Sequence, residues 1–249
     1  ALGGFMSNAG PHSPTNNLGG LSGVYTTPHV HAEARGVFTH TSPTATSRGA
    51  GRPEASYAIE RTIDVAAAEL GIDPVELRRR NMISPEAMPY DTGFVFTYDS
   101  GEFEVCLDRA VEAADRNGFA ARQKEAQSRG KLRGMGIASV IEIAGGPLPI
   151  PNEESAAVRF DTDGGVSVLM GTHSHGQGHE TAFAQIASEK LGVPFHSIRV
   201  QYGDTDLVHH GKGTFGSRSI SVGGAALQRA SEKIIDRARK IAAHLLEAA

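Results

Sequence analysis

Cysteine is nearly absent from this sequence, since Cys106 is the single one among 249 residues. One cysteine excludes an intrachain disulfide, an iron–sulfur cluster with four cysteine ligands and a cysteine-rich zinc site. Cys106 lies in a helical pattern, GEFEVCLDRAVEAAD, with Phe103, Leu107 and Val111 on the same side. This pattern predicts a buried thiol that acts as a small apolar side chain rather than as a nucleophile.

Excess positive charge, long apolar runs and a signal-like start are also missing. The formal net charge is −4, which argues against a nucleic-acid partner held through its phosphates. No apolar run approaches the roughly 20 residues of a membrane span. The first residues, ALGGFMSNAG, contain no cationic segment and no initial methionine. We therefore expect a cytoplasmic protein without a membrane span, and we expect the chain to be a piece of a longer one.

Hydrophobic periodicity predicts an α+β fold, with helices packed on mixed or antiparallel sheets. Helices are expected at residues 53–70 and 74–81, twice within 102–129, and from about 177 and 219 onward. Strands are expected at 35–40, at 134–145, in a hairpin around 161–165, and at 197–203. A change in composition divides the chain into a helix-rich region, 1–132, and an α+β region, 133–249. The last helix should bury one stripe, namely Leu227, Ile234, Ala238, Ile241 and Leu245.

A glutamine between two glycines precedes the clearest helical pattern, in SHGQGHETAFAQIASEKLG. Phe183, Ile186, Ala187 and Leu191 fall on one helix face. A flexible turn at a helix start leaves backbone N–H groups pointing outward, and the helix dipole adds partial positive charge. The segment therefore predicts an anion site, although an ordinary turn before a helix has the same pattern.

Two further loops have a similar character. GTFGSRSISVGG is rich in glycine and serine and enters a helix, so that Ser217, Arg218 and Ser219 are candidate donors to phosphate oxygens or ring heteroatoms. Helix capping by a serine explains the same residues equally well. In SRGAGRPEA, Arg48 stands among small residues, but the third glycine of a dinucleotide fingerprint is missing.

Histidines near the glutamine raise the alternative of a zinc site. The candidate ligands are His173, His175, His179, Asp204, Asp206, His209 and His210. Gly176 and Gly178 oppose a shared helix face for His175 and His179, and no HExxH occurs. A phosphate-binding GxxxxGKS/T sequence is absent as well.

Five segments in order resemble the large molybdenum subunit of the xanthine dehydrogenase and aldehyde oxidase family, in particular its carbon-monoxide-dehydrogenase-like members. They are RGAGRPEASYAIER, DPVELRRRNMI, PYDTGFVFTYDSG, GTHSHGQGHETAFAQIASEKLGVP, and YGDTD with GTFGSRS. The resemblance covers nearly the whole chain. It implies a molybdopterin cofactor, in the cytosine dinucleotide form, and hydroxylation of an aldehyde or N-heterocycle carbon with oxygen from water.

The resemblance also implies a role for each matching position. The glycine–glutamine–glycine loop implies that the cofactor is bound by Gly176, Gln177, Gly178 and His179. The serine-rich loop implies cofactor contacts from Gly216, Ser217, Arg218 and Ser219. Arg48 and Gly49 would lie beside the molybdenum, and Ala50 would face the substrate. The pterin's dithiolene sulfurs hold the metal in this family, so no metal ligand is expected from this chain.

Departures from the family pattern limit what the chain does by itself. The family's general base is a glutamate in a Gly-Val-Gly-Glu stretch, which does not occur here. No catalytic residue is therefore expected within these residues, and the isolated chain should be inactive. FAD and 2Fe–2S clusters belong to other subunits or domains. The expected partners are the rest of the molybdenum subunit, an iron–sulfur subunit and an FAD subunit, in a homo- or hetero-oligomer.

Copper-dependent carbon monoxide oxidation is not expected, because TSPTATSRGAG lacks the cysteine of the AYRCSFR segment in such enzymes. Two other functions remain as alternatives. One is a non-catalytic cofactor-binding or assembly module that shares the fold. The other is a metal-dependent hydrolase that uses the histidine cluster.

Overall fold

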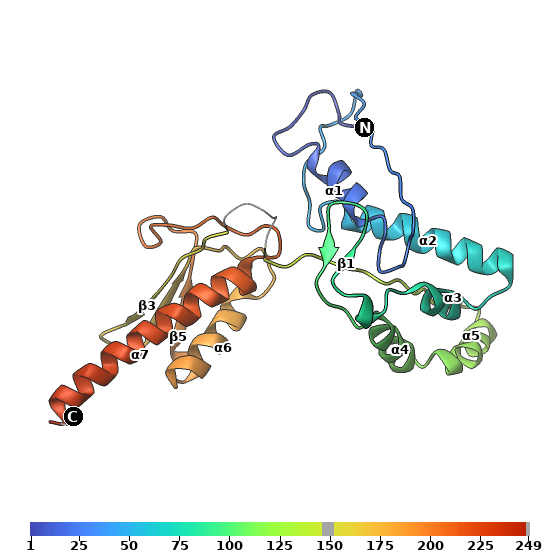
Figure 1. Ribbon diagram of the computed structural model, residues 1–249. Coiled ribbons are helices and arrows are strands. Elements are labelled where there is room, and N and C mark those ends of the chain that lie inside the picture. Colours follow the sequence, from blue (N-terminus) through green and yellow to red (C-terminus); the bar gives the residue numbers. More distant parts are fainter. Residues whose placement is uncertain (146–151, 248–249) are drawn as a thin grey trace. The chain divides into compact units, whose positions relative to one another are not determined.

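The structure is a computed structural model that describes residues 1–145 and 152–247. Contacts divide the chain into two compact units, Ala1–Glu142 and Ile143–Ala249, and each is described by itself. The predicted boundary between a helix-rich region, 1–132, and an α+β region, 133–249, stays a prediction. The α+β class is confirmed, because the described residues form helices together with two small sheets (Figure 1). None of the described helices is long and apolar enough to cross a membrane.

Helices dominate the first unit. They are α1 (His12–Gly20), α2 (Arg52–Leu70), α3 (Pro74–Asn81), α4 (Phe103–Ala113) and α5 (Phe119–Ser128), with short 3₁₀ turns η1 (Pro85–Ala87) and η2 (Arg116–Gly118). Two short antiparallel strands, β1 (Tyr90–Asp91) and β2 (Thr97–Tyr98), form a hairpin. Gly71 ends α2 in a left-handed conformation, and Asp73 caps α3 by accepting from the N–H groups of Val75 and Glu76. These helix boundaries confirm the helices predicted at residues 53–70 and 74–81.

The second unit is a three-stranded sheet with two helices. Its elements are β3 (Ala156–Phe160), β4 (Val166–Met170), α6 (His179–Leu191), η3 (Phe195–Ser197), β5 (Ile198–Gln201), the π-helix η4 (Ser219–Gly224) and α7 (Ala225–Leu245). The sheet order is β3-β4-β5, with β3 antiparallel and β5 parallel to β4. The hairpin, the strand near residue 198 and both helices confirm the predictions.

The core of the second unit lies between the sheet and its helices. Alternate residues of β4 face it, so that the side chains of Val166, Val168 and Met170 are fully buried. They pack against Phe183 and Ala187 of α6 and Leu227 of α7. Both helices lie along the same face of the sheet (Figure 1).

Two strands predicted from the sequence are absent from the described residues. Residues 35–40 form only an isolated bridge, between Gly3 and Phe38. Residues 134–145 form no strand in the part of the chain that the structure describes. The carbonyl of Ile137 instead accepts a hydrogen bond from Arg78 Nη2 at 3.2 Å. An apolar run becomes a strand only beside another strand, and none lies beside this one among the described residues.

Predicted burial was wrong on two helices. Cys106 is exposed, because Leu107 takes the inward position on α4. On α7 only the first residue of the predicted stripe is fully buried, and the exposed fraction reaches 51% at Ile241 and 74% at Leu245. A helix of 21 residues is about 32 Å long, whereas a five-residue strand spans about 17 Å, so the sheet covers only the first half.

Candidate functional site

Three segments of the second unit meet at one edge of its sheet. β4 and β5 are parallel, so the loops that follow them, 171–178 and 202–218, leave from the same carboxyl edge. β3 is antiparallel to β4, so residues 152–155 enter at that edge as well. Crevices at the carboxyl ends of parallel strands are the usual ligand sites of such sheets. The topology therefore brings together both glycine-rich loops of the second unit.

The glycines before α6 keep its N-terminus open. Gly176 and Gly178 have φ values of 95° and 79°, which side chains rarely adopt. A Cβ atom added at either glycine would meet nothing within 4 Å. Because α6 begins at His179, its first backbone N–H groups have no partner within the helix. The glycine backbone before the helix is thus open, and the helix start adds partial positive charge.

Gln177 is half-buried and its amide is oriented by its own loop. The backbone N–H of His175 donates to Oε1 of Gln177 at 2.5 Å. An N–H group needs an acceptor, so this bond identifies the oxygen of the amide and leaves Nε2 as the donor side. The structure therefore presents Gln177 as a hydrogen-bond donor.

Two buried polar atoms next to this loop have no hydrogen-bond partner among the described residues. They are Nδ1 of His179, whose residue is 3% exposed, and Oγ1 of Thr172, whose residue is 0% exposed. Burial lowers the pKa of His179, which favours the neutral imidazole. Buried polar groups are normally hydrogen-bonded, so this pair fits a polar ligand held at the loop.

The other histidines of the loop form an aromatic cluster. The ring of His173 lies 4.9 Å from the rings of His175 and Tyr202. The hydroxyl of Tyr202 donates to Glu180, which lowers the pKa of that carboxyl and raises the pKa of the tyrosine. Within residues 1–145 and 152–247, no three histidine, cysteine, aspartate or glutamate side chains are grouped so as to hold a metal ion. The zinc hypothesis therefore finds no ligand set in this part of the chain.

The serine-rich loop exposes its serine but not its arginine. Gly216 and Ser217 have positive φ values of 57° and 52°, and both residues are exposed. Ser219, which is 8% exposed, begins η4. The guanidinium of Arg218 is instead fully buried and paired with Glu154. The sequence predicted Arg218 as a donor to a ligand, whereas the structure directs its side chain into the unit.

A hydrogen-bonded pair connects the two loops. The backbone N–H of His173 donates to Oγ1 of Thr214 at 3.0 Å, and that hydroxyl donates in turn to the carbonyl of His173. Thr214 lies at the start of the serine-rich loop, and His173 precedes the glycine–glutamine–glycine loop. Sequence reasoning missed Thr172, Thr214 and Glu154. The two threonines lie within GTHSHGQG and GTFGSRS, but the resemblance assigns them no role, and Glu154 lies outside these motifs.

The loop that contains Arg48, in SRGAGRPEA, belongs to the first unit. Gly49, Ala50 and Gly51 have φ values of 100°, 44° and 98°, so three consecutive residues are left-handed. A Cβ at Gly49 would lie 2.7 Å from the ring of Pro53, so only glycine fits there. Arg48 is exposed and has no hydrogen bond or ion pair to the described residues. The next arginine, Arg52, is buried instead, with its guanidinium 4.8 Å from the ring centroid of Phe96.

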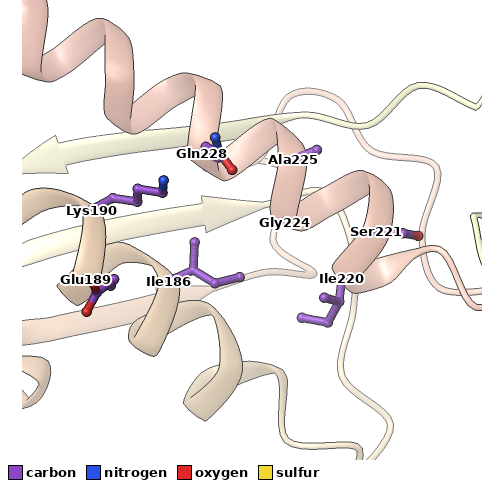
Figure 2. A pocket seen from close by; sticks show the side chains of 8 residues that line it. All are labelled: Ile186, Glu189, Lys190, Ile220, Ser221, Gly224, Ala225 and Gln228. Carbon is purple, nitrogen blue, oxygen red and sulfur yellow. The ribbon is translucent and has the colours of Figure 1, made fainter.

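A shallow hollow of about 370 Å³ lies between α6 and the start of α7 (Figure 2). Ile186 and Ile220 contribute apolar surface, and Lys190 and Glu189 contribute charge. None of the predicted site residues lines it. The loops at the carboxyl edge, rather than this hollow, contain the open backbone and the buried polar atoms without partners.

Replacement of Gly211 by alanine is expected to destabilise the second unit. The chain crosses itself at this glycine, because a Cβ there would lie 2.5 Å from both Cα and the carbonyl oxygen of Gly171. Backbone cannot move aside as a flexible side chain does, so the substitution should cost at least about 1–3 kcal/mol. Denaturant unfolding followed by hydrogen exchange of the β4 amides measures the change. Gly224→Ala is the matched control, because its added Cβ would lie 3.4 Å from the nearest atom. Equal stability of the two variants would contradict the close backbone contact between Gly211 and Gly171.

Comparison with known proteins identifies the domains. A family model described as a molybdopterin cofactor-binding domain matches residues 109–249, and a second model with the same description matches residues 1–82. The chain is 40% identical to the carbon monoxide dehydrogenase large chain of Hydrogenophaga pseudoflava, over 94% of this chain and 31% of that protein. It spans about a third of the length of the curated relatives that it matches.

Solved structures agree with the family models. Quinoline 2-oxidoreductase from Pseudomonas putida 86 is 34% identical with a TM-score of 0.85, over 100% of this chain and 33% of that chain. Reconstituted CO dehydrogenase from Oligotropha carboxidovorans is 38% identical with a TM-score of 0.76, over 93% of this chain and 31% of that chain.

Proposed function

The chain belongs to the xanthine dehydrogenase and aldehyde oxidase family of molybdopterin-binding subunits, and we propose that it forms part of the molybdenum-binding subunit of a hydroxylase. The proposed reaction is oxidation of an aldehyde or an N-heterocycle, with water as the source of oxygen. One observation carries the proposal: open glycine backbone at the carboxyl edge stands beside the buried, unpartnered polar atoms of His179 and Thr172.

The residues of the two loops fit a molybdopterin cofactor chemically. Such a cofactor supplies the redox chemistry when bound, while the protein supplies binding, orientation and electrostatics. We assign contacts with it to Gly176, Gln177, Gly178, His179, Gly216, Ser217 and Ser219. The amide Nε2 of Gln177 and the backbone N–H groups stabilise negative charge without gaining or losing a proton. Neutral donors of this kind suit a centre whose charge changes during a reaction.

Arg48, Gly49 and Ala50 are assigned by resemblance to the neighbourhood of the metal and the substrate. The exposure of Arg48 and the lack of a partner for it among the described residues support this assignment. The small side chain of Ala50 would leave space for a substrate ring. One of the similar structures is an enzyme named for quinoline. Quinoline is an N-heterocycle, and its ring is consistent with such a space.

The finer features of the enzyme are also proposals. They are a cytosine dinucleotide form of the cofactor, FAD and 2Fe–2S clusters on other subunits or domains, and a cytoplasmic homo- or hetero-oligomer. Carbon monoxide is not proposed as a substrate, although two of the curated relatives are named for it. The loop at residues 41–51 contains no cysteine, and the one cysteine of the chain, Cys106, lies on α4.

Purification of the enzyme that contains this chain, followed by cofactor analysis, tests the proposal. We expect about one molybdenum and one pterin per subunit, and release of cytidine monophosphate on hydrolysis. Dye-linked oxidation of quinoline or benzaldehyde should accompany them. Cofactor without oxidation of either class would favour an assembly module, and absence of both molybdenum and pterin would refute the proposal.

A further inference from the structure

The side chain of Arg218 is buried in the interior of the second unit. Its exposed fraction is 0%, and its guanidinium donates to four acceptors. Nε donates to Oδ1 of Asn152 at 2.6 Å, and Nη1 donates to the carbonyl of Gly213 at 2.8 Å and to Glu154. Nη2 donates to the carbonyl of Glu153. A guanidinium has five N–H donors, so four of them are already used inside the protein.

Glu154 is the centre of this arrangement. Its side chain is also 0% exposed, and its two oxygens divide their bonds between different segments. Oε2 accepts from Arg218, while Oε1 accepts from the backbone N–H groups of Ser155 at 3.0 Å and Lys212 at 3.3 Å. One carboxylate therefore joins the start of β3 to two points of the loop 202–218.

The bonds around Glu154 determine the path of the whole loop. Ser155 Oγ donates to the carbonyl of His210, and Gly211 crosses Gly171 at backbone contact. Beyond the crossing, Thr214 is bonded to His173, and the ring of Phe215 lies 5.1 Å from the guanidinium of Arg218. These contacts leave Ser217 exposed at the end of the loop, directly before the buried Arg218. The buried pair thus sets where the serine and its neighbouring amides stand relative to the glycine–glutamine–glycine loop.

We propose that Arg218 and Glu154 are positioning residues: their buried ion pair holds the serine-rich loop in the conformation that binds the cofactor, and Arg218 does not touch the cofactor itself. This inference rests on the proposed function for its ligand. Breaking a buried pair leaves one charge unpaired and strongly disfavours the native arrangement, whereas replacing both partners by apolar residues is often neutral. The two roles of Arg218, positioning and direct contact, therefore predict different outcomes for single and double variants.

The experiment uses the assembled enzyme and three variants, Arg218→Met, Glu154→Leu and the double variant. Two quantities are measured: molybdenum and pterin per subunit, and hydrogen exchange of the amides in residues 211–219. Each single variant should lose cofactor on the order of tenfold or more and lose exchange protection in the loop. The double variant should regain part of both, because it leaves no unpaired charge, although the bonds from Ser155 and Lys212 to Glu154 stay lost. Arg237→Met, an exposed arginine on α7, is the control and should match the wild type in both measurements.

A direct contact would give another pattern. If the double variant regained loop protection but remained as poor in cofactor as Arg218→Met, Arg218 would be a ligand of the cofactor and the inference would be wrong. Glu154→Gln is a milder variant, because it removes the charge but keeps the size of the side chain. Glu154 is fully buried, so a ligand does not contact it directly. We expect this variant to lower both quantities, and full cofactor with full protection would overturn the inference.

The wild-type measurement separates this inference from the proposed function. An enzyme without molybdenum or pterin would refute the proposed function, while the exchange data would still test the pair. Rapid exchange throughout residues 211–219 of the wild type would show that no positioned loop exists, whatever the ligand.

Discussion

Replacement of Gln177 by alanine is expected to lower turnover of the assembled enzyme by ~10²–10³-fold, the usual cost of removing one preorganised donor from a charged centre. The side chain is oriented before any ligand arrives, because the N–H of His175 already occupies its Oε1. Only the Nε2 donor is lost in the variant. The backbone should be unaffected, since the left-handed turns are made by Gly176 and Gly178 rather than by the glutamine.

Steady-state turnover and molybdenum content of the Gln177→Ala enzyme test this expectation together. Gln185→Ala is the matched control, because Gln185 is an exposed glutamine on α6 within the same unit. Equal melting temperatures for both variants would show that the fold is kept. Near-normal turnover with normal molybdenum content in the Gln177 variant would contradict the role of its amide.

The second large effect concerns stability in the first unit. Arg78→Met is expected to lower the free energy of unfolding of that unit by about 3–5 kcal/mol, because it leaves a buried carboxylate unpaired. The side chain of Arg78 is 0% exposed and that of Glu60 is 6% exposed, with Nε and Oε2 2.8 Å apart. Arg78 also bonds Asp64 at 2.9 Å and the carbonyl of Pro74 at 3.0 Å.

Tyr25 extends this network. Its hydroxyl donates to the other oxygen of Glu60 at 2.6 Å, and burial together with that bond raises the pKa of the tyrosine. The matched control is Arg80→Met on the same helix, because Arg80 is 59% exposed and pairs with Glu76 at the surface. Such surface pairs are worth only about 0.3–0.5 kcal/mol. Denaturant unfolding monitored by hydrogen exchange of α2 and α3 compares the two variants, and equal losses would show that the buried network contributes little.

Local signals explain which parts of the fold the sequence predicted. Gly71 and Asp73 determine helix ends through backbone conformation and capping, and both act within a few residues. The alternation in β4 and the helical spacing of α6 describe faces that pack on each other, so pattern and burial agree there. These elements were predictable because each needs no information about distant residues.

Distant contacts explain what the sequence did not predict. An apolar run such as residues 134–145 has strand composition, but its pairing depends on a neighbour that composition does not identify. The exposed end of α7 follows from the shortness of the strands on which it packs. Likewise, GSRS identifies a loop that enters a helix but not the direction of its arginine, which depends on Glu154, 64 residues away along the chain.

The central claim is that the two glycine-rich loops at the carboxyl edge of the second unit bind one molybdenum cofactor. Anomalous diffraction at the molybdenum edge, from crystals of the purified enzyme, tests it most directly. We predict one anomalous peak beside Nε2 of Gln177, with cofactor density continuing to the backbone of Ser217 and Ser219. A peak elsewhere in the subunit, or a cofactor that meets only one of the two loops, would contradict the claim.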